Sequence, residues 1–362
     1  MKTIKRLTRM PLFLPIFSMV LVMLVNVISD IAKGEPAFSF FAVSLSQTTQ
    51  SGTILFGRIV DILNRGSETA ILAIGMTLVV SASAGTDISV GSVMSLAGGV
   101  CCVLLAGFGN TSVSEYAMPL WVGIGAGILV ACLCGAFNGF LVSYMNIQPM
   151  VATLILFSAG RAIGLLLCNS SIVYVRVPTF QFFGSYCWIF PTPVLIAAAC
   201  ILTISLVLKF TALGTYVQAV GINKRAARIA GYQSKRIIFM AFVICGLCAG
   251  VAGIVATSRI YSADTNNIGL NLELDAILAV ALGGNSLGGG RFRLSGSIIG
   301  AYTIQAITTT LYALGVSSAQ APVFKAIIVL LIVVIQAPVV RVYLDKRAAR
   351  RALDQTREVA QL

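Results

Sequence analysis

A single carboxylate interrupts the apolar part of the chain in the stretch SAGTDISVGS, residues 83–92. Two kinds of chemistry fit Asp87. The turn can cap the following helix through Thr86, Asp87 or Ser89, which contributes about 1 kcal/mol. Alternatively, Asp87 accepts hydrogen bonds from the hydroxyls of a polar solute, because a carboxylate at membrane depth is a candidate for function by default. Irregular backbone at that depth lines a cavity or the protein interior.

A second interruption falls late in the chain. The short apolar run 276–282 is preceded by Glu273 and Asp275 and followed by GGNSLGGG, residues 283–290. Short or glycine-broken segments in the two halves of a transporter indicate the solute region. We therefore predict that residues 84–92 and 283–290 lie near each other beside a pathway. With the polar residues found in apolar surroundings, the predicted pathway set is Asp87, Ser89, Gln148, Arg161, Glu273, Asn285 and Ser286.

Enzymatic and metal chemistry have little support in the sequence. The chain has no histidine, so no histidine base or ligand exists. Glu273 and Asp275 are two residues apart, so on a helix they point to different faces and do not form a catalytic pair. Cys245 and Cys248 have the spacing of a metal or redox pair. Apolar surroundings keep such thiols inert, which favours two small helix-packing residues, and we predict no metal site.

The elements that position these residues are membrane helices. The chain has 362 residues, of which 58% are hydrophobic and 10% are charged, whereas soluble domains average about 25% charged residues. Ten apolar stretches follow one another, at residues 11–30, 60–84, 88–108, 118–143, 149–168, 193–209, 235–257, 271–283, 294–314 and 321–340. Most approach the roughly 20 residues that cross a bilayer as a helix. We predict an all-α polytopic membrane protein with about ten transmembrane helices in the lipid bilayer, some of them short or broken near the pathway.

The charges predict the orientation of the chain. The net charge is +13, which in a soluble protein would suggest a nucleic-acid partner. If the N-terminus lies in the cytoplasm, ten crossings return the C-terminus to the same side, and most of the 25 basic residues lie inside. Because cytoplasmic loops carry an excess of Lys and Arg, we predict an N-in, C-in topology and no nucleic-acid partner.

The largest predicted cytoplasmic loop, residues 211–236, reads TALGTYVQAVGINKRAARIAGYQSKR. Its glycines divide it into a short helix, a turn and a second short helix. A basic amphipathic helix often rests on anionic lipid. The small residues around Ala227 bury little apolar area and suit close approach to a protein groove, which favours docking of a cytoplasmic partner.

This loop resembles the coupling loop of permease subunits in ATP-binding cassette (ABC) importers for sugars. The pattern Gly-x-Asn-x-x-Ala-Ala-x-x-Ala-Gly is matched by Gly221, Asn223, Ala226, Ala227, Ala230 and Gly231. Residues 73–79, 87–92 and 278–290 resemble further motifs of that family, with Ala84 and Ile88 as departures from a usual glycine and leucine. The resemblance covers about residues 59–338. Within the family, residues 191–193, 264–267 and 272–279 are most similar to galactofuranose-type permeases.

The resemblance implies partners that this chain does not supply. No phosphate-binding G-x-x-x-x-G-K-[ST] stretch occurs, so ATP and Mg²⁺ are expected on a separate cytoplasmic ABC ATPase that docks at residues 211–236. A periplasmic sugar-binding protein and a second permease subunit, identical or homologous, are also implied. Residues 1–345 would form the permease domain in the bacterial inner membrane, and residues 346–362 a basic cytoplasmic tail.

The function implied by the resemblance is non-catalytic translocation of a monosaccharide, galactofuranose or another aldose, driven by the ATPase subunits. The alternative is a self-contained secondary transporter or channel for a small polar solute. That alternative requires an ion site of its own and leaves the coupling loop without a purpose.

Overall fold

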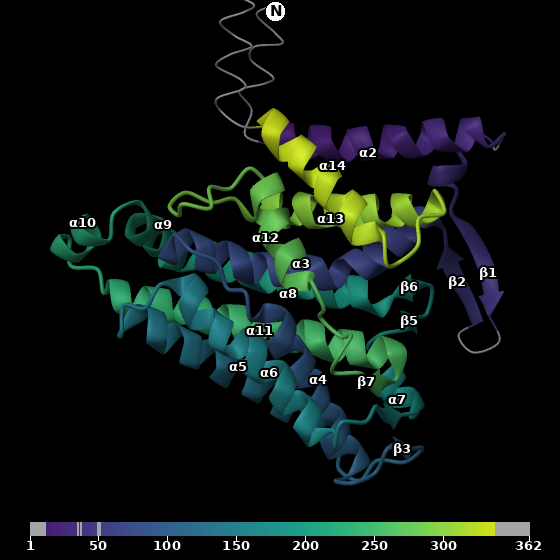
Figure 1. Cartoon of the computed structure of the whole chain (residues 1–362), viewed down its shortest axis with the longest axis horizontal. Coiled ribbons are helices and arrows are strands. Elements are labelled where there is room, and N and C mark those ends of the chain that lie inside the picture. The colour runs from purple at the N-terminus through teal and green to yellow at the C-terminus, as the bar shows by residue number, and fades with distance from the viewer. Residues whose placement is uncertain (1–11, 35, 37, 49–51, 337–362) are drawn as a thin grey trace, which may run out of the picture.

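The computed structural model describes residues 12–34, 36, 38–48 and 52–336. The predicted basic tail, residues 346–362, and the basic residues before residue 12 lie outside these ranges. Long helices lie side by side along the longest axis of the molecule, and short strands gather at one end (Figure 1).

Each of the ten predicted apolar stretches contains a helix. These helices are α2 (Phe13–Ala32), α3 (Arg58–Ser83), α4 (Val90–Ala106), α5 (Leu120–Ser143), α6 (Pro149–Leu167), α8 (Thr192–Phe210), α11 (Ser234–Ile260), α12 (Leu272–Leu282), α13 (Leu294–Ala313) and α14 (Ala321–Gln336). Six of them, α2, α3, α5, α6, α8 and α11, are long and apolar enough to cross a membrane. The prediction of a helical, multi-pass membrane protein is confirmed, and the number of ten crossings stays a prediction.

The two ends of the helical body differ. The strand end carries β1 (Ser44–Thr48) paired antiparallel with β2 (Gly52–Phe56), β5 (Tyr186–Cys187) with β6 (Phe190–Pro191), and a small sheet of β3 (Ser112–Val113), β4 (Val173–Val175) and β7 (Ser262–Ala263). The 3₁₀ helix η1 (Ser39–Phe41) and α7 (Pro178–Gln181) lie there too. At the opposite end, called the basic end here, lie α9 (Leu213–Ile222) and α10 (Lys224–Ile229) (Figure 1). The described cations of the basic end are Lys209, Lys224, Arg225, Arg228, Lys235, Arg236, Arg291 and Arg293.

Helix α3 is the centre of the molecule. Its residues are buried without interruption from Gly66 to Ala82, and it contacts α8, α11, α12 and α13. A helix buried on all sides needs small residues where its neighbours approach closely. At Gly75 a Cβ atom would lie 2.8 Å from the Cα of Cys245, so α11 packs directly on the α3 backbone. Cys245 and Cys248 are both buried at this contact, as expected for small packing residues.

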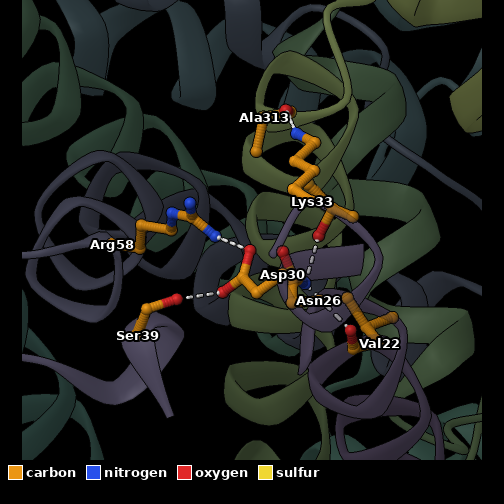
Figure 2. A network of polar contacts seen from close by, with 8 residues as sticks. Val22, Asn26, Asp30, Lys33, Ser39, Arg58 and Ala313 are labelled. Carbon is orange, nitrogen blue, oxygen red and sulfur yellow. Dashed lines mark hydrogen bonds and ion pairs between the residues drawn. The ribbon is translucent and has the colours of Figure 1, made fainter. Parts of the chain in front are cut away.

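Helix α2 is fixed to the body by a polar network close to the strand end (Figure 2). Arg58 donates from Nη1 to Asp30 Oδ1 at 2.6 Å, and the Ser39 hydroxyl donates to Asp30 Oδ2 at 2.6 Å. One turn earlier, the Asn26 amide donates to the Thr310 hydroxyl of α13 at 2.6 Å. Polar groups buried in an apolar body are stable only when hydrogen-bonded, so these contacts determine how α2 lies against α3 and α13.

Candidate coupling segment and polar interior

The coupling segment, residues 213–231, is built as predicted from two short helices and a turn. Asn223 separates α9 from α10 in an extended conformation, and its Oδ1 accepts from the backbone N–H groups of Arg225 and Ala226, each at 3.0 Å. An asparagine at this position satisfies two of the free N–H groups that begin a helix. The asparagine of the sequence motif is therefore the N-cap of α10.

The second glycine of the motif ends α10. Gly231 has φ of +87°, a conformation that costs glycine nothing but strains other residues. Its N–H donates to the Arg228 carbonyl, and the N–H of Tyr232 donates to the Ala227 carbonyl, both at 3.0 Å. This pair of bonds is a Schellman motif, which closes a helix and reverses the chain. The chain then enters α11 directly.

Between its N-cap and its C-terminal Schellman motif, α10 presents a small apolar face to solvent. Ala227 is buried against the body, whereas Ala226 and Ala230 are exposed. Ile229 is 88% exposed and Ile222, at the end of α9, is 63% exposed. An exposed apolar face on a short helix, flanked by arginines, is a surface that fits a protein groove.

Gly221 joins the coupling segment to the interior through backbone alone. A Cβ atom on Gly221 would overlap the Ser81 carbonyl oxygen at the end of α3 and would lie 2.6 Å from the backbone nitrogen of Gly290. The same Ser81 carbonyl accepts from the Gly290 N–H at 3.0 Å. We call this contact of Ser81, Gly221 and Gly290 the Ser81 junction. It brings α9, α3 and the loop after α12 to one point.

The two predicted interruptions meet beside this junction. Gly289, with φ of +85°, packs on Ala84, and a Cβ atom there would lie 3.0 Å from the Ala84 Cβ. The turn after α3 and the glycine-rich loop after α12 are thus neighbours at the basic end. Ser286 is exposed there, with its hydroxyl accepting from the Gly288 N–H at 3.2 Å.

Asp87 is buried and organises the start of α4. Its Oδ1 accepts from the backbone N–H of Ser89 at 2.9 Å and from the Ser89 hydroxyl at 2.6 Å. Asn138 of α5 donates to the Ser89 hydroxyl oxygen at 2.8 Å. Among the residues that the structure describes, no side chain caps α4 at Ser89, and the Thr86 hydroxyl has no partner. Capping of α4 by Thr86, Asp87 or Ser89 is therefore wrong, because Asp87 bonds to the residue before the helix and turns Ser89 toward α5.

Arg161 of α6 holds a non-helical segment, residues 264–271, against α4. Its Nη1 donates to three carbonyl oxygens in that segment, those of Thr265, Asn266 and Ile268, at 2.9, 2.7 and 3.2 Å. The Ser95 hydroxyl of α4 also donates to the Thr265 carbonyl, at 2.8 Å. We call the contact of Arg161 with these carbonyls the Arg161 clamp. A guanidinium that gathers several carbonyls supplies the donors that irregular backbone in a membrane protein needs.

Glu273 lies directly after the clamped segment, at the start of α12. It is buried, and its side chain packs so closely on Gly91 of α4 that a Cβ atom at Gly91 would overlap its Oε2. Gly269, which follows the clamped Ile268, packs on the same Gly91, so the clamp and the Glu273 side chain meet α4 at one point. Two residues on, Asp275 forms an ion pair with Lys325 of α14, whose Nζ lies 2.7 and 2.8 Å from the two carboxylate oxygens.

Several buried polar atoms in this interior lack partners among the described residues. They include Glu273 Oε2, Arg161 Nη2, the Thr265 hydroxyl and Asn138 Oδ1. A buried donor or acceptor without a partner costs about 1–3 kcal/mol. Such groups are retained where they serve a solute or where another conformation satisfies them, so this part of the structure has free capacity for hydrogen bonds.

The remaining predicted pathway residues lie elsewhere. Asn285 uses its amide inside its own loop, accepting from the Arg293 N–H at 2.7 Å and donating to the Ser297 hydroxyl at 2.7 Å. Gln148 is exposed at the basic end and lines a cavity of about 350 Å³ with Gly221 and Lys224. The structure therefore brings Arg161 close to Glu273, and sets Asn285, Ser286 and Gln148 apart at the basic end.

Sequence reasoning missed the segment 264–271 and the backbone of Ser81. The segment runs beside α4, with Thr265 next to Ser95 and Gly269 against Gly91. The signal was the length of the following apolar run. A helix of 11 residues is about half of what a crossing requires, so the chain must travel part of the way without helix.

A family model described as the branched-chain amino acid transport system permease component matches residues 58–336. The galactofuranose transporter permease protein YtfT of Escherichia coli strain K12 is 44% identical over 286 residues, covering 78% of this chain and 80% of that protein. The fructose import permease protein FruF of Bifidobacterium longum strain NCC 2705 is 35% identical over 319 residues, covering 87% and 86%. The ribose import permease protein RbsC of E. coli K12 is 33% identical over 298 residues, covering 81% and 89%.

Proposed function

The chain belongs to the family of branched-chain amino acid transport system permease components, and we propose that it forms the membrane path of an ATP-driven importer for a monosaccharide. The relatives named for galactofuranose, fructose and ribose support a sugar. The 44% identity to the galactofuranose permease supports an aldose of that type. We propose that the protein resides in a bacterial inner membrane.

The basic end faces the cytoplasm in this proposal, in line with the excess of Lys and Arg on that side of membrane proteins. An ABC ATPase on a separate chain, with its ATP and Mg²⁺, docks on the exposed face of α10. Its contacts include the exposed apolar side chain of Ile229 and the exposed Ala226 and Ala230, which are small enough for close approach. The N-cap and the Schellman motif hold α10 as a rigid unit, so a displacement of α10 is transmitted rather than absorbed.

The Ser81 junction is the observation that carries this mechanism. Because Gly221 touches the Ser81 carbonyl without any side chain between them, movement of α9 presses directly on the end of α3. The hydrogen bond from Gly290 to the same carbonyl passes the movement to the loop after α12. Packed backbone is not compressible, so closure of the ATPase shifts both interruptions together.

The polar interior lies next to these elements, where the start of α4 meets the start of α12. We propose that the unpartnered atoms of Arg161 and Glu273, with Asp87 and Ser89 of the neighbouring turn, supply hydrogen bonds to a neutral sugar during passage. A periplasmic sugar-binding protein delivers the sugar at the strand end, and a second permease subunit, identical or homologous, completes the path.

The test is a pair of glycine substitutions in the complex assembled with its ATPase and binding protein. Gly221→Ala places a methyl group on the Ser81 carbonyl, and we expect substrate-stimulated ATP hydrolysis to fall to near the unstimulated rate. Gly125→Ala is the matched control, because Gly125 is a helical glycine with open space around it. Unchanged stimulation in Gly221→Ala, with the complex still assembled, would contradict the proposal.

A second measurement tests the alternative function, in which the chain is a self-contained transporter. The full chain alone, in vesicles that hold an ion gradient, is expected to take up no sugar. Uptake should begin when the ATPase and MgATP are present inside and the sugar-binding protein is present outside. Solute uptake by the chain alone would replace the proposal with secondary transport.

A further inference from the structure

A positively charged cleft of about 460 Å³ opens at the basic end where α5 ends and α11 begins. Its walls include Tyr144, Arg228, Tyr232, Ser234, Lys235 and Arg236. These residues come from three elements, α10, the turn after it and the start of α11, and from the residue that follows α5. The cleft is separate from the Ser81 junction and from the polar interior.

The cleft is rich in donors and contains no acid. Among the described ion pairs none involves Arg228, Lys235 or Arg236. Burial lowers the pKa of the neighbouring Lys224, and the positive charges of Arg228 and Lys235 lower it further. The cations of this surface therefore lie close enough to repel one another. The N-terminus of α11 also lacks a side-chain cap, and the uncapped start of a helix of 27 residues adds a positive dipole end. This surface selects an anion.

The cleft continues into a membrane-facing apolar stripe. Tyr144 stacks on Phe140 of α5 with ring centroids 5.6 Å apart, and the Lys235 ammonium lies 5.6 Å from the Tyr144 ring centroid. Below them on α5, Phe137 and Leu133 are exposed at helical spacing. A cation and a tyrosine above a row of exposed apolar side chains mark the level where headgroups meet hydrocarbon.

We propose that this cleft binds the phosphate-bearing headgroup of an anionic phospholipid, whose acyl chains lie along the exposed stripe of α5. Basic clefts between membrane helices on the cytoplasmic side suit such headgroups. The apolar stripe favours a lipid over a soluble phosphate as the ligand, because only a lipid can contact both the cations and the apolar residues below them. The inference depends on the placement of α5 and α11 in the bilayer and on neither the ATPase nor the sugar.

The experiment is native mass spectrometry of the full chain in detergent, titrated with phosphatidylglycerol or phosphatidylcholine. We expect phosphatidylglycerol to remain bound and phosphatidylcholine to be lost. Each cation near a membrane surface contributes roughly fivefold in affinity for anionic lipid. We therefore expect Arg236→Gln to weaken phosphatidylglycerol binding roughly fivefold, and Lys235→Gln with Arg236→Gln roughly twenty-fivefold.

The control removes the same charge from the same end outside the cleft, with Arg225→Gln and Arg291→Gln. It should bind phosphatidylglycerol as the parent chain does, and all variants should keep the parent melting temperature. Equal losses in the two double variants, or equal binding of both lipids, would overturn the proposal. Displacement of phosphatidylglycerol by millimolar inorganic phosphate would show that the cleft binds free phosphate. That result would also overturn the proposal of a lipid site.

Discussion

The Ser81 junction and the Arg161 clamp hold irregular backbone in opposite ways. At the junction, Gly221 and Gly290 meet a carbonyl with no side chain between them. At the clamp, one long side chain reaches three carbonyls. The junction is a steric contact and resists compression, whereas the clamp is a directional tether and resists separation.

This difference shows where motion enters the molecule and where it is restrained. A steric contact transmits a push of α9 toward α3, and it tolerates no added atom. A tether of hydrogen bonds keeps its partner in register until the bonds exchange, and it is sensitive to the loss of charge. The following substitutions separate the two, from the largest expected effect to the smallest.

The largest loss is expected at the other side-chain tether, the ion pair of Lys325 and Asp275. Lys325→Met leaves a buried carboxylate without its partner and should lower the free energy of unfolding by about 4 kcal/mol. Adding Asp275→Leu should restore most of that stability, because the unpaired charge is removed. Unfolding in mixed micelles measures both variants, and equal or larger loss in the double variant would count against a tether.

Removal of the Arg161 clamp comes next. Arg161→Gln retains a polar side chain but loses the charge that serves three carbonyls, so we expect a loss of about 3 kcal/mol in unfolding free energy. Arg176→Gln is the control, since Arg176 is exposed at the strand end and rests on the Tyr174 ring. If both variants unfold alike, the clamp does not stabilise the segment.

A steric contact inside the membrane body should give a smaller loss. Gly91→Ala places a methyl group against Glu273 and the Gly269 carbonyl, and overpacking of this kind costs about 2 kcal/mol. Gly125→Ala, in open space, should instead gain up to about 1 kcal/mol from helix propensity. The same unfolding assay measures both variants. Stabilisation of both would show that the contact of Gly91 with Glu273 and Gly269 adjusts easily to an added methyl group.

The smallest effect belongs to the cap of α10. Asn223→Ala removes the acceptor for two N–H groups and should cost about 1 kcal/mol locally, read as faster amide hydrogen exchange at Arg225 and Ala226. Asn223→Ser keeps an acceptor, so exchange should return toward the parent rate. Equal rates of amide hydrogen exchange in the two variants would mean that α10 is stabilised only by the Schellman motif at its C-terminus.

Much of the architecture was predictable from the sequence because it depends on runs of residues. Each apolar stretch became a helix, and Gly231 marked the turn that ends the coupling segment. The role of Asn223 required no more than its position before a short helix.

Other features depend on partners that a residue pattern does not reveal. The donors of Arg161 go to backbone carbonyls, which every residue has, so nothing in the letters TNNIG distinguishes residues 265–269 from a solvated loop. The turn at Asp87 was ambiguous for a related reason. Its outcome was decided by Asn138, which lies 49 positions after Ser89. The pairing of Asp275 with Lys325 is equally remote in sequence.

The bond between Asn26 and Thr310 in the polar network of α2 spans 284 positions, which has a consequence for biogenesis. The ribosome delivers the first helix long before the ninth. Until then, the Asn26 amide has within the described chain only the Val22 carbonyl of its own helix. A nascent chain halted before residue 310 therefore presents an incompletely satisfied amide in lipid, and α2 gains its full stability only when α13 is in place.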